Sequence, residues 1–203
     1  MVPFRNRESD LSASPPPAVG AHHDERAAVD AVLGGDRDAF RVLVDREAAS
    51  VVRACHRILG DLHEAEDVAQ EAFVTAFRSL SAWRGDGPFG AWLTRIAVRI
   101  ALRRVGRRRD VTWIDPMDPS RGVDLPGGLD PVATTLQAER AADVRAAVSR
   151  LDEPYRETVA LRFFGELSLD EIAAQTGRPL GTVKTHLHRG LLRLRAAVEG
   201  GAG

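Results

Sequence analysis

The stretch LSLDEIAAQTGRPLGTVKTHLHRGLLRLR, residues 167–195, carries the clearest structural signal in the chain. Ser168 and Glu171 stand at the head of an apolar segment, in the spacing of a capping box that begins a helix. Gly177 and Pro179 end this helix after about two turns. A second helix follows, with leucines and a valine at helical spacing along one side. The stretch therefore predicts a helix-turn-helix.

The second helix of this motif offers polar and cationic side chains opposite its apolar side. The second helix of a helix-turn-helix lies in the major groove of DNA, so these side chains would reach base edges. The candidates are Lys184, Thr185, His186, His188 and Arg189. One alternative is an ordinary helical hairpin with a solvated basic face. Another is a metal site at the two histidines, but no cysteine or carboxylate lies nearby at ligand spacing. We therefore expect a DNA-binding helix and no metal.

Two helical segments and a linker make up the rest of the chain. Apolar residues recur at helical spacing in residues 24–109 and again in residues 134–199, without strand-like alternation of useful length. Residues 110–133 combine prolines and glycines with five aspartates and a single arginine, which predicts an acidic flexible linker. Residues 1–23 predict a disordered tail. We therefore expect an all-α fold of two small helical domains.

Glycines and one aspartate mark the helix ends of the first segment. Gly34 and Gly60 are expected to end helices, and Asp61 is expected to cap the next one. The glycine-containing loop 84–88 precedes a fourth helix that contains Phe89. The first segment is therefore predicted to be a bundle of four helices.

The net charge of −1 hides a strong segregation of charge along the sequence. Residues 61–71 hold five acids and no Lys or Arg, whereas residues 95–109 hold seven arginines and no acid. Residues 172–198 again lack acids and hold four arginines and Lys184. Two basic stretches and one acidic stretch predict two nucleic-acid surfaces and a third surface for another partner.

Several observations argue against other classes of protein. Cys55 is the single cysteine, which excludes an intramolecular disulfide and fits a reducing compartment. No apolar run reaches the ~18 residues of a membrane span, and the N-terminus lacks the apolar core of a secretory signal. The sequence has no HExxH, GxSxG or P-loop motif and no paired-carboxylate pattern. We expect a cytoplasmic protein without membrane insertion, catalytic residues or a cofactor.

Three arginines form a stripe on the predicted fourth helix. Arg95, Arg99 and Arg103 recur every four residues, and Trp83 and Trp92 stand near them in sequence. We call the three arginines the arginine stripe. Arginines bind phosphates and aromatic rings stack on unpaired bases, so the combination suits single-stranded DNA. The alternatives are a solvated basic face and aromatic rings that pack in the core.

Acidic residues follow one side of the predicted third helix. Glu64, Asp67 and Glu71 recur at helical spacing opposite the small apolar residues. Acids in the first turn favour the helix dipole, which accounts for Glu64 but not for Glu71. An acidic surface would repel DNA, so a basic protein partner and a merely solvated face remain the two interpretations.

These motifs together resemble a known family. Region 2 of the extracytoplasmic-function (ECF) sigma factors is similar to AEDVAQEAF (65–73) and FGAWLTRIA (89–97). Region 4 of the same family is similar to LDEPYRE (151–157), LRFF (161–164), LSLDEIA (167–173) and GTVKTHLHRG (181–190). The resemblance covers roughly residues 24–105 and 134–197. It implies a sigma region 2 helical bundle followed by a sigma region 4 helix-turn-helix.

The resemblance also implies partners and residue roles. Asp67, Gln70 and Glu71 would bind the clamp helices of the largest subunit of RNA polymerase, one of several contacts with the core enzyme. The arginine stripe and the loop before it would capture the melted −10 promoter element. The candidate residues of the second helix of the helix-turn-helix would read the −35 element. The resemblance further implies an anti-sigma partner and a stress or envelope-signal regulon.

Two positions depart from the family pattern. Arg99 stands where many relatives carry an asparagine that can read a −10 base, and His188 stands where relatives vary between aromatic and polar residues. The promoter sequence is therefore not carried over with the resemblance. The runner-up interpretation is a stand-alone helix-turn-helix regulator, which would not need the acidic helix and would dimerise through an apolar surface.

We also expect the free chain to bind DNA weakly. Its two basic surfaces would pack against each other or against the linker until core polymerase separates them to a fixed promoter spacing. Two modest contacts joined in this way gain from a high effective concentration.

Overall fold

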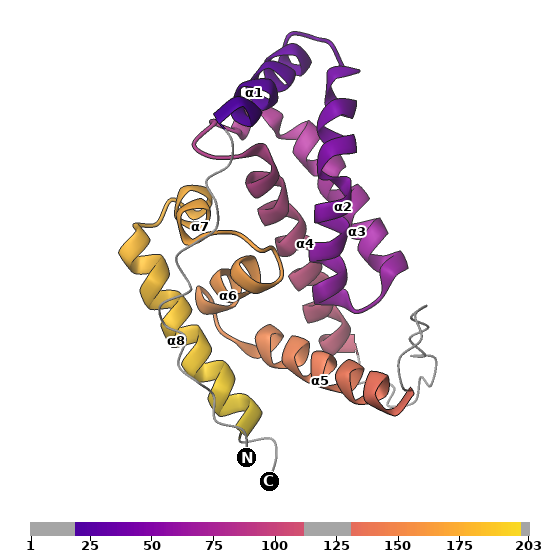
Figure 1. Ribbon diagram of the computed structural model, residues 1–203, viewed down its shortest axis with the longest axis vertical. Helices are drawn as coiled ribbons and strands as arrows, with labels where there is room; N and C mark the ends of the chain where they lie inside the picture. Colours follow the sequence, from indigo (N-terminus) through magenta and orange to yellow (C-terminus); the bar gives the residue numbers. More distant parts are fainter. Residues whose placement is uncertain (1–18, 112–130, 200–203) are drawn as a thin grey trace.

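A computed structural model describes residues 19–111 and 131–199 of the chain, and Figure 1 shows two groups of helices, α1–α4 and α5–α8, that lie side by side. In chain order the elements are α1 (Val19–Leu33), α2 (Ala39–Leu59), α3 (Leu62–Arg78), the 3-10 turn η1 (Leu80–Ala82), α4 (Phe89–Val111), α5 (Pro131–Arg150), α6 (Tyr155–Phe163), α7 (Leu169–Thr176) and α8 (Leu180–Glu199). Within the described residues the prediction of an all-α fold with two helical domains is confirmed.

The N-terminal domain contains a helical hairpin, α2 and α3, whose turn at Gly60 and Asp61 was predicted from the sequence. Helix α2 ends at Gly60, which adopts a left-handed conformation with φ 78°. The side chain of Asp61 then caps α3 by accepting a hydrogen bond from the Glu64 amide at 2.8 Å. Helix α4 packs against both helices of the hairpin. The fully buried side chains of these three helices include aliphatic residues and one aromatic residue: Leu43, Val51, Val68, Leu93, Val98 and Phe89.

The C-terminal domain holds the helix-turn-helix. Helix α8 packs along α6, α7 lies across the two, and α5 contacts both α6 and α8. Its core contains Val148, Val159, Leu161, Ile172 and Val183. Close packing of these side chains stabilises the arrangement of the four helices.

Helix α4 also forms the boundary between the two domains. It contacts α5, α6 and α7 of the C-terminal domain, and α2 contacts α5. In Figure 1, α6 and α7 lie between α4 and α8. Helix α8, drawn in yellow, therefore runs along the outside of the molecule.

Three helix ends differ from the predicted limits. Helix α1 begins at Val19, inside the segment predicted to be a disordered tail. Helix α4 continues to Val111 and α5 begins at Pro131, so both run into the predicted linker. Proline fits the first position of a helix, because the amide there has no partner within the helix. Residues 1–18 and 112–130 lie outside the described residues, so the tail, the linker and the domain limits 24–109 and 134–199 stay predictions.

Candidate nucleic-acid and polymerase interfaces

The first helix of the helix-turn-helix, α7, has a defined local structure at each end. The Ser168 hydroxyl accepts a hydrogen bond from the Glu171 amide at 3.2 Å, and Glu171 accepts one from the Ser168 amide at 2.8 Å. This is the reciprocal capping box that the sequence indicated. Gly177 ends α7 in a left-handed conformation with φ 67°, which favours glycine. Both ends of α7 are therefore fixed by contacts within the motif.

Four of the five candidate residues on α8 are exposed. Their side chains are those of Lys184, Thr185, His188 and Arg189. We call these four residues the recognition face. Val183 and Leu187 lie between them in sequence and are buried, because they form the inward side of the same helix. The recognition face is therefore open to a ligand in this structure.

The fifth candidate, His186, is placed differently. Its ring meets the Tyr155 ring edge to face, with 5.7 Å between centroids, and its Nδ1 atom is buried without a hydrogen-bond partner. Burial, followed by the charges of Arg178 and Arg189, lowers the pKa of His186 below its ordinary value. The neutral His186 ring packs on Tyr155 and so contributes to the contact between α8 and α6. His186 is thus not grouped with the recognition face.

Helix α8 approaches α6 unusually closely at Gly190. This glycine is buried, and an added Cβ atom would lie 2.7 Å from the Cγ2 atom of Val159 and 3.4 Å from the Cβ atom of Tyr155. Beside it, the Arg193 guanidinium lies 4.4 Å from the centre of the Tyr155 ring and pairs with Asp152 at 3.0 Å. The missing side chain therefore sets the distance between the recognition helix and the rest of its domain.

The arginine stripe meets a buried carboxylate of the other domain. Glu157 on α6 is 4% exposed, and its Oε1 atom lies 3.1 Å from Nε of Arg95 and 3.0 Å from Nε of Arg99. Its Oε2 atom accepts a hydrogen bond from Arg178, in the turn before α8, at 3.2 Å. Arg95 also donates to the Gln175 carbonyl. We call Glu157 with these three arginines the Glu157 cluster.

The Glu157 cluster is held together by charge. Burial alone would raise the pKa of Glu157, but the charge and hydrogen bond of Arg95 and the charges of Arg99 and Arg178 outweigh it. The pKa is therefore below its ordinary value and the carboxylate is ionised at neutral pH. The sequence pattern did not assign a role to Glu157. Its arginine partners on α4 lie about sixty residues away in sequence, which no local pattern reveals.

The expected packing of the two basic surfaces on each other is not seen in the described residues, and packing on the linker falls on residues 112–130, which lie outside them. In the described residues the arginine stripe is covered by α6 and α7 through Glu157 and Gln175, whereas the recognition face takes no part in this contact. Arg103, the third arginine of the stripe, is exposed beyond the cluster.

The aromatic residues near the stripe pack mainly into the N-terminal domain. Phe89 is fully buried, with Trp83 edge-on at 6.0 Å and Trp92 tilted at 5.7 Å between ring centroids. Trp83 and Trp92 pack against the core with most of their surface and remain partly exposed.

The three candidate residues for polymerase binding share the outer side of α3. Asp67, Gln70 and Glu71 are all exposed. Glu71 lies 3.3 Å from an Nη atom of Arg104 on α4, and its side chain is 51% exposed, so the pair leaves the carboxylate accessible. Asp67, Gln70 and Glu71 are called the acidic face below.

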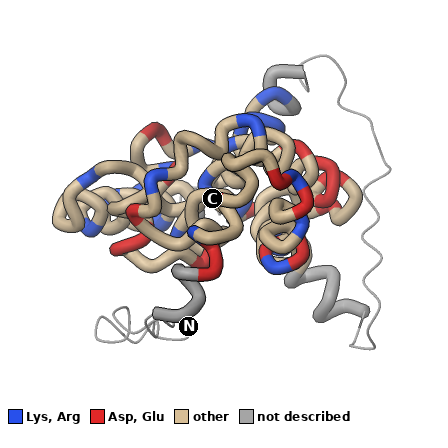
Figure 2. The backbone as a smooth tube through the Cα atoms, turned by 90° about the horizontal axis from the view of Figure 1, so that it is seen from above, with Lys and Arg blue, Asp and Glu red and all other residues tan. Residues whose placement is uncertain are grey.

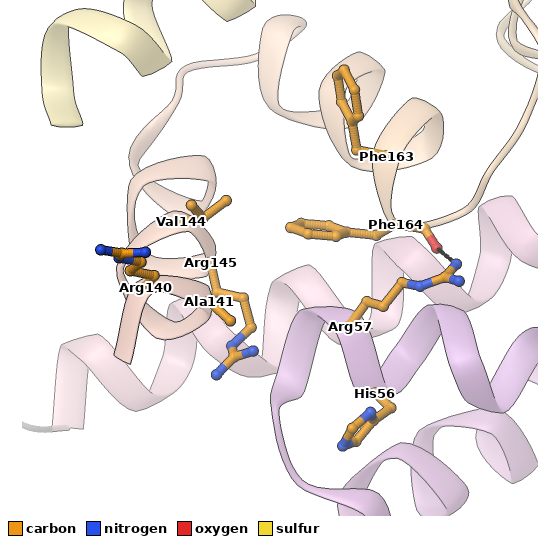
Figure 3. A pocket seen from close by; sticks show the side chains of 8 residues that line it. All are labelled: His56, Arg57, Arg140, Ala141, Val144, Arg145, Phe163 and Phe164. Atoms are coloured by element: carbon orange, nitrogen blue, oxygen red, sulfur yellow. Dashed lines mark hydrogen bonds between the residues drawn. The ribbon is translucent and has the colours of Figure 1, made fainter. Parts of the chain in front are cut away.

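A second set of contacts joins the domains at the far end of α2. Arg57 pairs with Glu166 at 2.7 Å and donates a hydrogen bond to the Phe164 carbonyl at 3.2 Å. Figure 3 shows this bond beside an open hollow of about 500 Å³ between the domains. The hollow is lined by His56, Arg57, Arg140, Ala141, Val144, Arg145, Phe163 and Phe164. None of the predicted site residues lines it.

Charge is distributed over both domains. Figure 2 shows basic and acidic positions interspersed along the described backbone, with no domain of a single sign. Among the described residues, no group of three His, Cys, Asp or Glu side chains is arranged to hold a metal ion. No described helix is long and apolar enough to cross a membrane.

Family models match both domains. The model for sigma-70 region 2 matches residues 43–111, and the model for sigma-70 region 4 matches residues 141–194. The first match contains the acidic face and the arginine stripe, and the second contains Glu157 and the recognition face.

Curated relatives match most of the chain. The ECF RNA polymerase sigma factor SigW of Bacillus subtilis (strain 168) is 33% identical over 170 residues, which cover 81% of this chain and 91% of the relative. The ECF RNA polymerase sigma-E factor of Escherichia coli (strain K12) is 36% identical over 173 residues, which cover 81% of this chain and 89% of the relative.

Two solved structures share the fold. CnrH, in complex with the cytosolic domain of CnrY, has a TM-score of 0.55 and 24% identity, and the match covers 87% of this chain and 98% of CnrH. The sigma factor RpoE of Bartonella quintana, in complex with the anti-sigma factor NepR, has a TM-score of 0.50 and 20% identity, with 79% and 96% of the two chains covered. With the family models and the curated relatives, the chain belongs to the ECF subfamily of the sigma-70 family, the RNA polymerase sigma factors of transcription initiation.

Proposed function

We propose that the chain brings core RNA polymerase to promoters through three separate binding surfaces. The acidic face of α3 binds the polymerase, the arginine stripe of α4 binds the melted −10 element, and the recognition face of α8 reads the −35 element. The observation that carries the proposal is the outward position of the recognition face on α8. This helix follows the capped helix α7 and its turn, as in a helix-turn-helix.

The chemistry of each surface suits its role. Lysine and arginine side chains at the start of an exposed helix can donate to guanine edges in the major groove. The guanidinium groups of α4 neutralise phosphates, and the partly exposed Trp83 and Trp92 offer ring surface to unpaired bases. The carboxylates of α3 repel DNA and attract a basic protein surface.

The Glu157 cluster supports a closed resting state. Two of the three arginines proposed to bind the −10 strand are occupied by a carboxylate of the other domain. A DNA phosphate and Glu157 would compete for the same guanidinium groups. Core polymerase would therefore have to part the domains before the −10 element is bound, and the free chain is expected to bind DNA weakly.

Further parts of the proposal rest on the family. We place the chain in the cytoplasm, without catalytic activity of its own, and under the control of an anti-sigma protein. The relative RpoE of Bartonella quintana forms a complex with such a partner, the anti-sigma factor NepR. A regulon for stress or envelope signals fits the same family.

Transcription in vitro with core polymerase on a promoter library tests the assignment of the recognition face and of the acidic face. Arg189→Ala should lose selection at −35 bases, with Arg41→Ala as a charge-matched control on an exposed part of α2. Glu71→Ala should lower transcription from every promoter alike, because polymerase binding precedes promoter choice. Asp30→Ala, an exposed carboxylate on α1, is its control.

Two outcomes would contradict the proposal. Unchanged −35 selection by Arg189→Ala would remove α8 from promoter reading. Failure of the wild-type chain to co-elute with core polymerase, together with tight operator binding by the free chain, would instead identify a stand-alone regulator.

A further inference from the structure

Helix α1 holds a buried carboxylate against the beginning of α4. Glu25 is 3% exposed, and its Oε2 atom accepts a hydrogen bond from the Phe89 amide at 3.0 Å. Its Oε1 atom pairs with an Nη atom of Arg46 on α2 at 2.9 Å. The two oxygens of one side chain therefore join three helices at a single point.

The beginning of α4 needs such a partner. The first amides of a helix have no acceptor within the helix, and Pro88, which precedes α4, has no side-chain oxygen to cap it. Glu25 supplies the missing acceptor from 64 residues earlier in the chain. A carboxylate at this end is also favoured by the helix dipole. Arg46 pairs with Glu47 at 3.3 Å as well, so one guanidinium group lies between two carboxylates.

The residue after Glu25 reaches the loop that leads into α4. Gly85 in this loop has φ 74°, and an added Cβ atom there would lie 2.8 Å from Nη1 of Arg26 and 4.0 Å from Cη2 of Trp83. Trp83 in turn meets the Phe89 ring edge-on. Two neighbouring residues of α1 thus support the loop 84–88 and the first turn of α4 together.

From these contacts we infer that Glu25, assisted by Arg26, positions the loop 84–88 and the first turn of α4 for the single-stranded −10 element. The inference rests on the proposed −10 role of α4 and names residues outside the region 2 match, which begins at residue 43. A loop held in its bound conformation does not lose that freedom on binding DNA, so its affinity is higher. Glu25 and Arg26 act through the loop and need not touch DNA.

The test uses the full chain assembled with core polymerase. A promoter that the wild-type holoenzyme selects from a randomised library provides a fork-junction probe, with duplex −35 DNA and a single-stranded −10 segment. Glu25→Ala should weaken binding of this probe about tenfold, which corresponds to the loss of a helix cap. Glu25→Gln retains an acceptor for the Phe89 amide and should weaken binding less. Asp24→Ala, an exposed neighbour on α1, should leave binding unchanged.

Three further measurements separate positioning from a general loss of structure. Hydrogen exchange in the free chain should become faster at residues 84–90 in Glu25→Ala and stay unchanged in Asp24→Ala. Co-elution with core polymerase and binding of duplex −35 DNA should match the wild type in both. If Glu25→Ala does not fold, Arg26→Ala removes the contact at Gly85 without exposing a buried group, and should weaken probe binding about threefold.

Arg99→Ala distinguishes the positioning role of α1 from the −10 role of α4. If Arg99→Ala weakens probe binding and the α1 variants do not, the positioning role is overturned and the −10 role of α4 stands. If Arg99→Ala binds the probe as the wild type does, or if the wild type selects no promoter, the −10 role is overturned and the inference falls with it. Equal loss of probe binding and of polymerase assembly in Glu25→Ala would also overturn the positioning role.

Discussion

Helices α4 and α8 both carry basic residues proposed to bind promoter DNA, but they are presented differently. The recognition face of α8 is exposed, whereas Arg95 and Arg99 of α4 are bound to Glu157 of the opposite domain. A basic sequence therefore does not by itself define an available surface. The contrast implies an order of events, in which duplex DNA can be read first and the −10 strand only after the domains part.

The contrast has an energetic basis. Glu157 is nearly buried, and its charge is compensated by three guanidinium groups from two domains. Breaking such a group costs more than breaking an exposed pair, because the remaining charges lose a partner in a region of low dielectric. Arg99 is 57% exposed in its side chain and contributes less than Arg95, at 23%.

The largest expected change in the arrangement of the domains comes from breaking the Glu157 cluster. Glu157→Gln should weaken the domain contact by about 2 kcal/mol, below the range for fully buried pairs because the arginines are partly exposed. Small-angle scattering should show a larger radius of gyration, and the free chain should bind single-stranded DNA more tightly. Asp170→Asn, an exposed carboxylate on α7, is the matched control. An unchanged radius and affinity would mean that the cluster does not keep the domains closed.

A second experiment compares the two basic surfaces directly in the free chain. Arg189→Ala should weaken binding to a duplex with the −35 element by about 1–3 kcal/mol, the range for a good base contact. Arg99→Ala should leave single-stranded DNA binding by the free chain unchanged, because its guanidinium is already occupied. In the Glu157→Gln background, Arg99→Ala should weaken the binding of single-stranded DNA by the free chain. Equal effects of Arg99→Ala in both backgrounds would show that the stripe is accessible without opening.

Acid should open the molecule through the same carboxylate. The folded-state pKa of Glu157 lies below its ordinary value of 4.5, so the stabilisation is present above that value and is lost as the pH falls through the folded-state pKa. The effect should be similar in size to that of Glu157→Gln, because a protonated carboxyl group and a glutamine amide both lose the charge and both keep an acceptor oxygen. A domain-to-domain fluorescence distance, followed as the pH falls below 4.5, should show a step in the wild type that Glu157→Gln lacks.

The smallest expected effect concerns the second interdomain ion pair. Glu166→Ala removes the partner of Arg57, but the two side chains are 64% and 36% exposed. A pair of this kind contributes about 0.5 kcal/mol or less. The radius of gyration and the melting temperature should therefore stay close to those of the wild type. A large opening in this variant would place the main domain contact at Arg57 and not at Glu157.

Local signals predicted the elements of the fold well. Gly60, Asp61, Ser168, Glu171 and Gly177 act at the helix ends as predicted, because caps and left-handed glycines depend on neighbours within four residues. The exposed recognition face followed from the spacing of the apolar residues on α8. The start of α5 at Pro131 was not predicted, since the proline was assigned to the linker composition.

Contacts between distant segments were not predictable in the same way. Glu157 and Glu25 resemble solvated acids on amphipathic helices, and their burial follows from partners on α4 that no spacing rule reveals. His186 belongs to the same class, because its neighbour Tyr155 lies on another helix. A basic stripe in a sequence therefore needs the tertiary structure before its availability can be stated.

Gly190 couples the position of the recognition face to the interior of its domain. A glycine in the middle of a helix costs about 1 kcal/mol relative to alanine, and at Gly190 this cost is offset by the close approach of α8 to α6. A methyl group there would meet Val159 and push α8 away from α6, which would shift every residue of the recognition face at once. With the −35 role proposed for α8, a substitution at this buried position would alter promoter preference while the four residues of the recognition face stay the same.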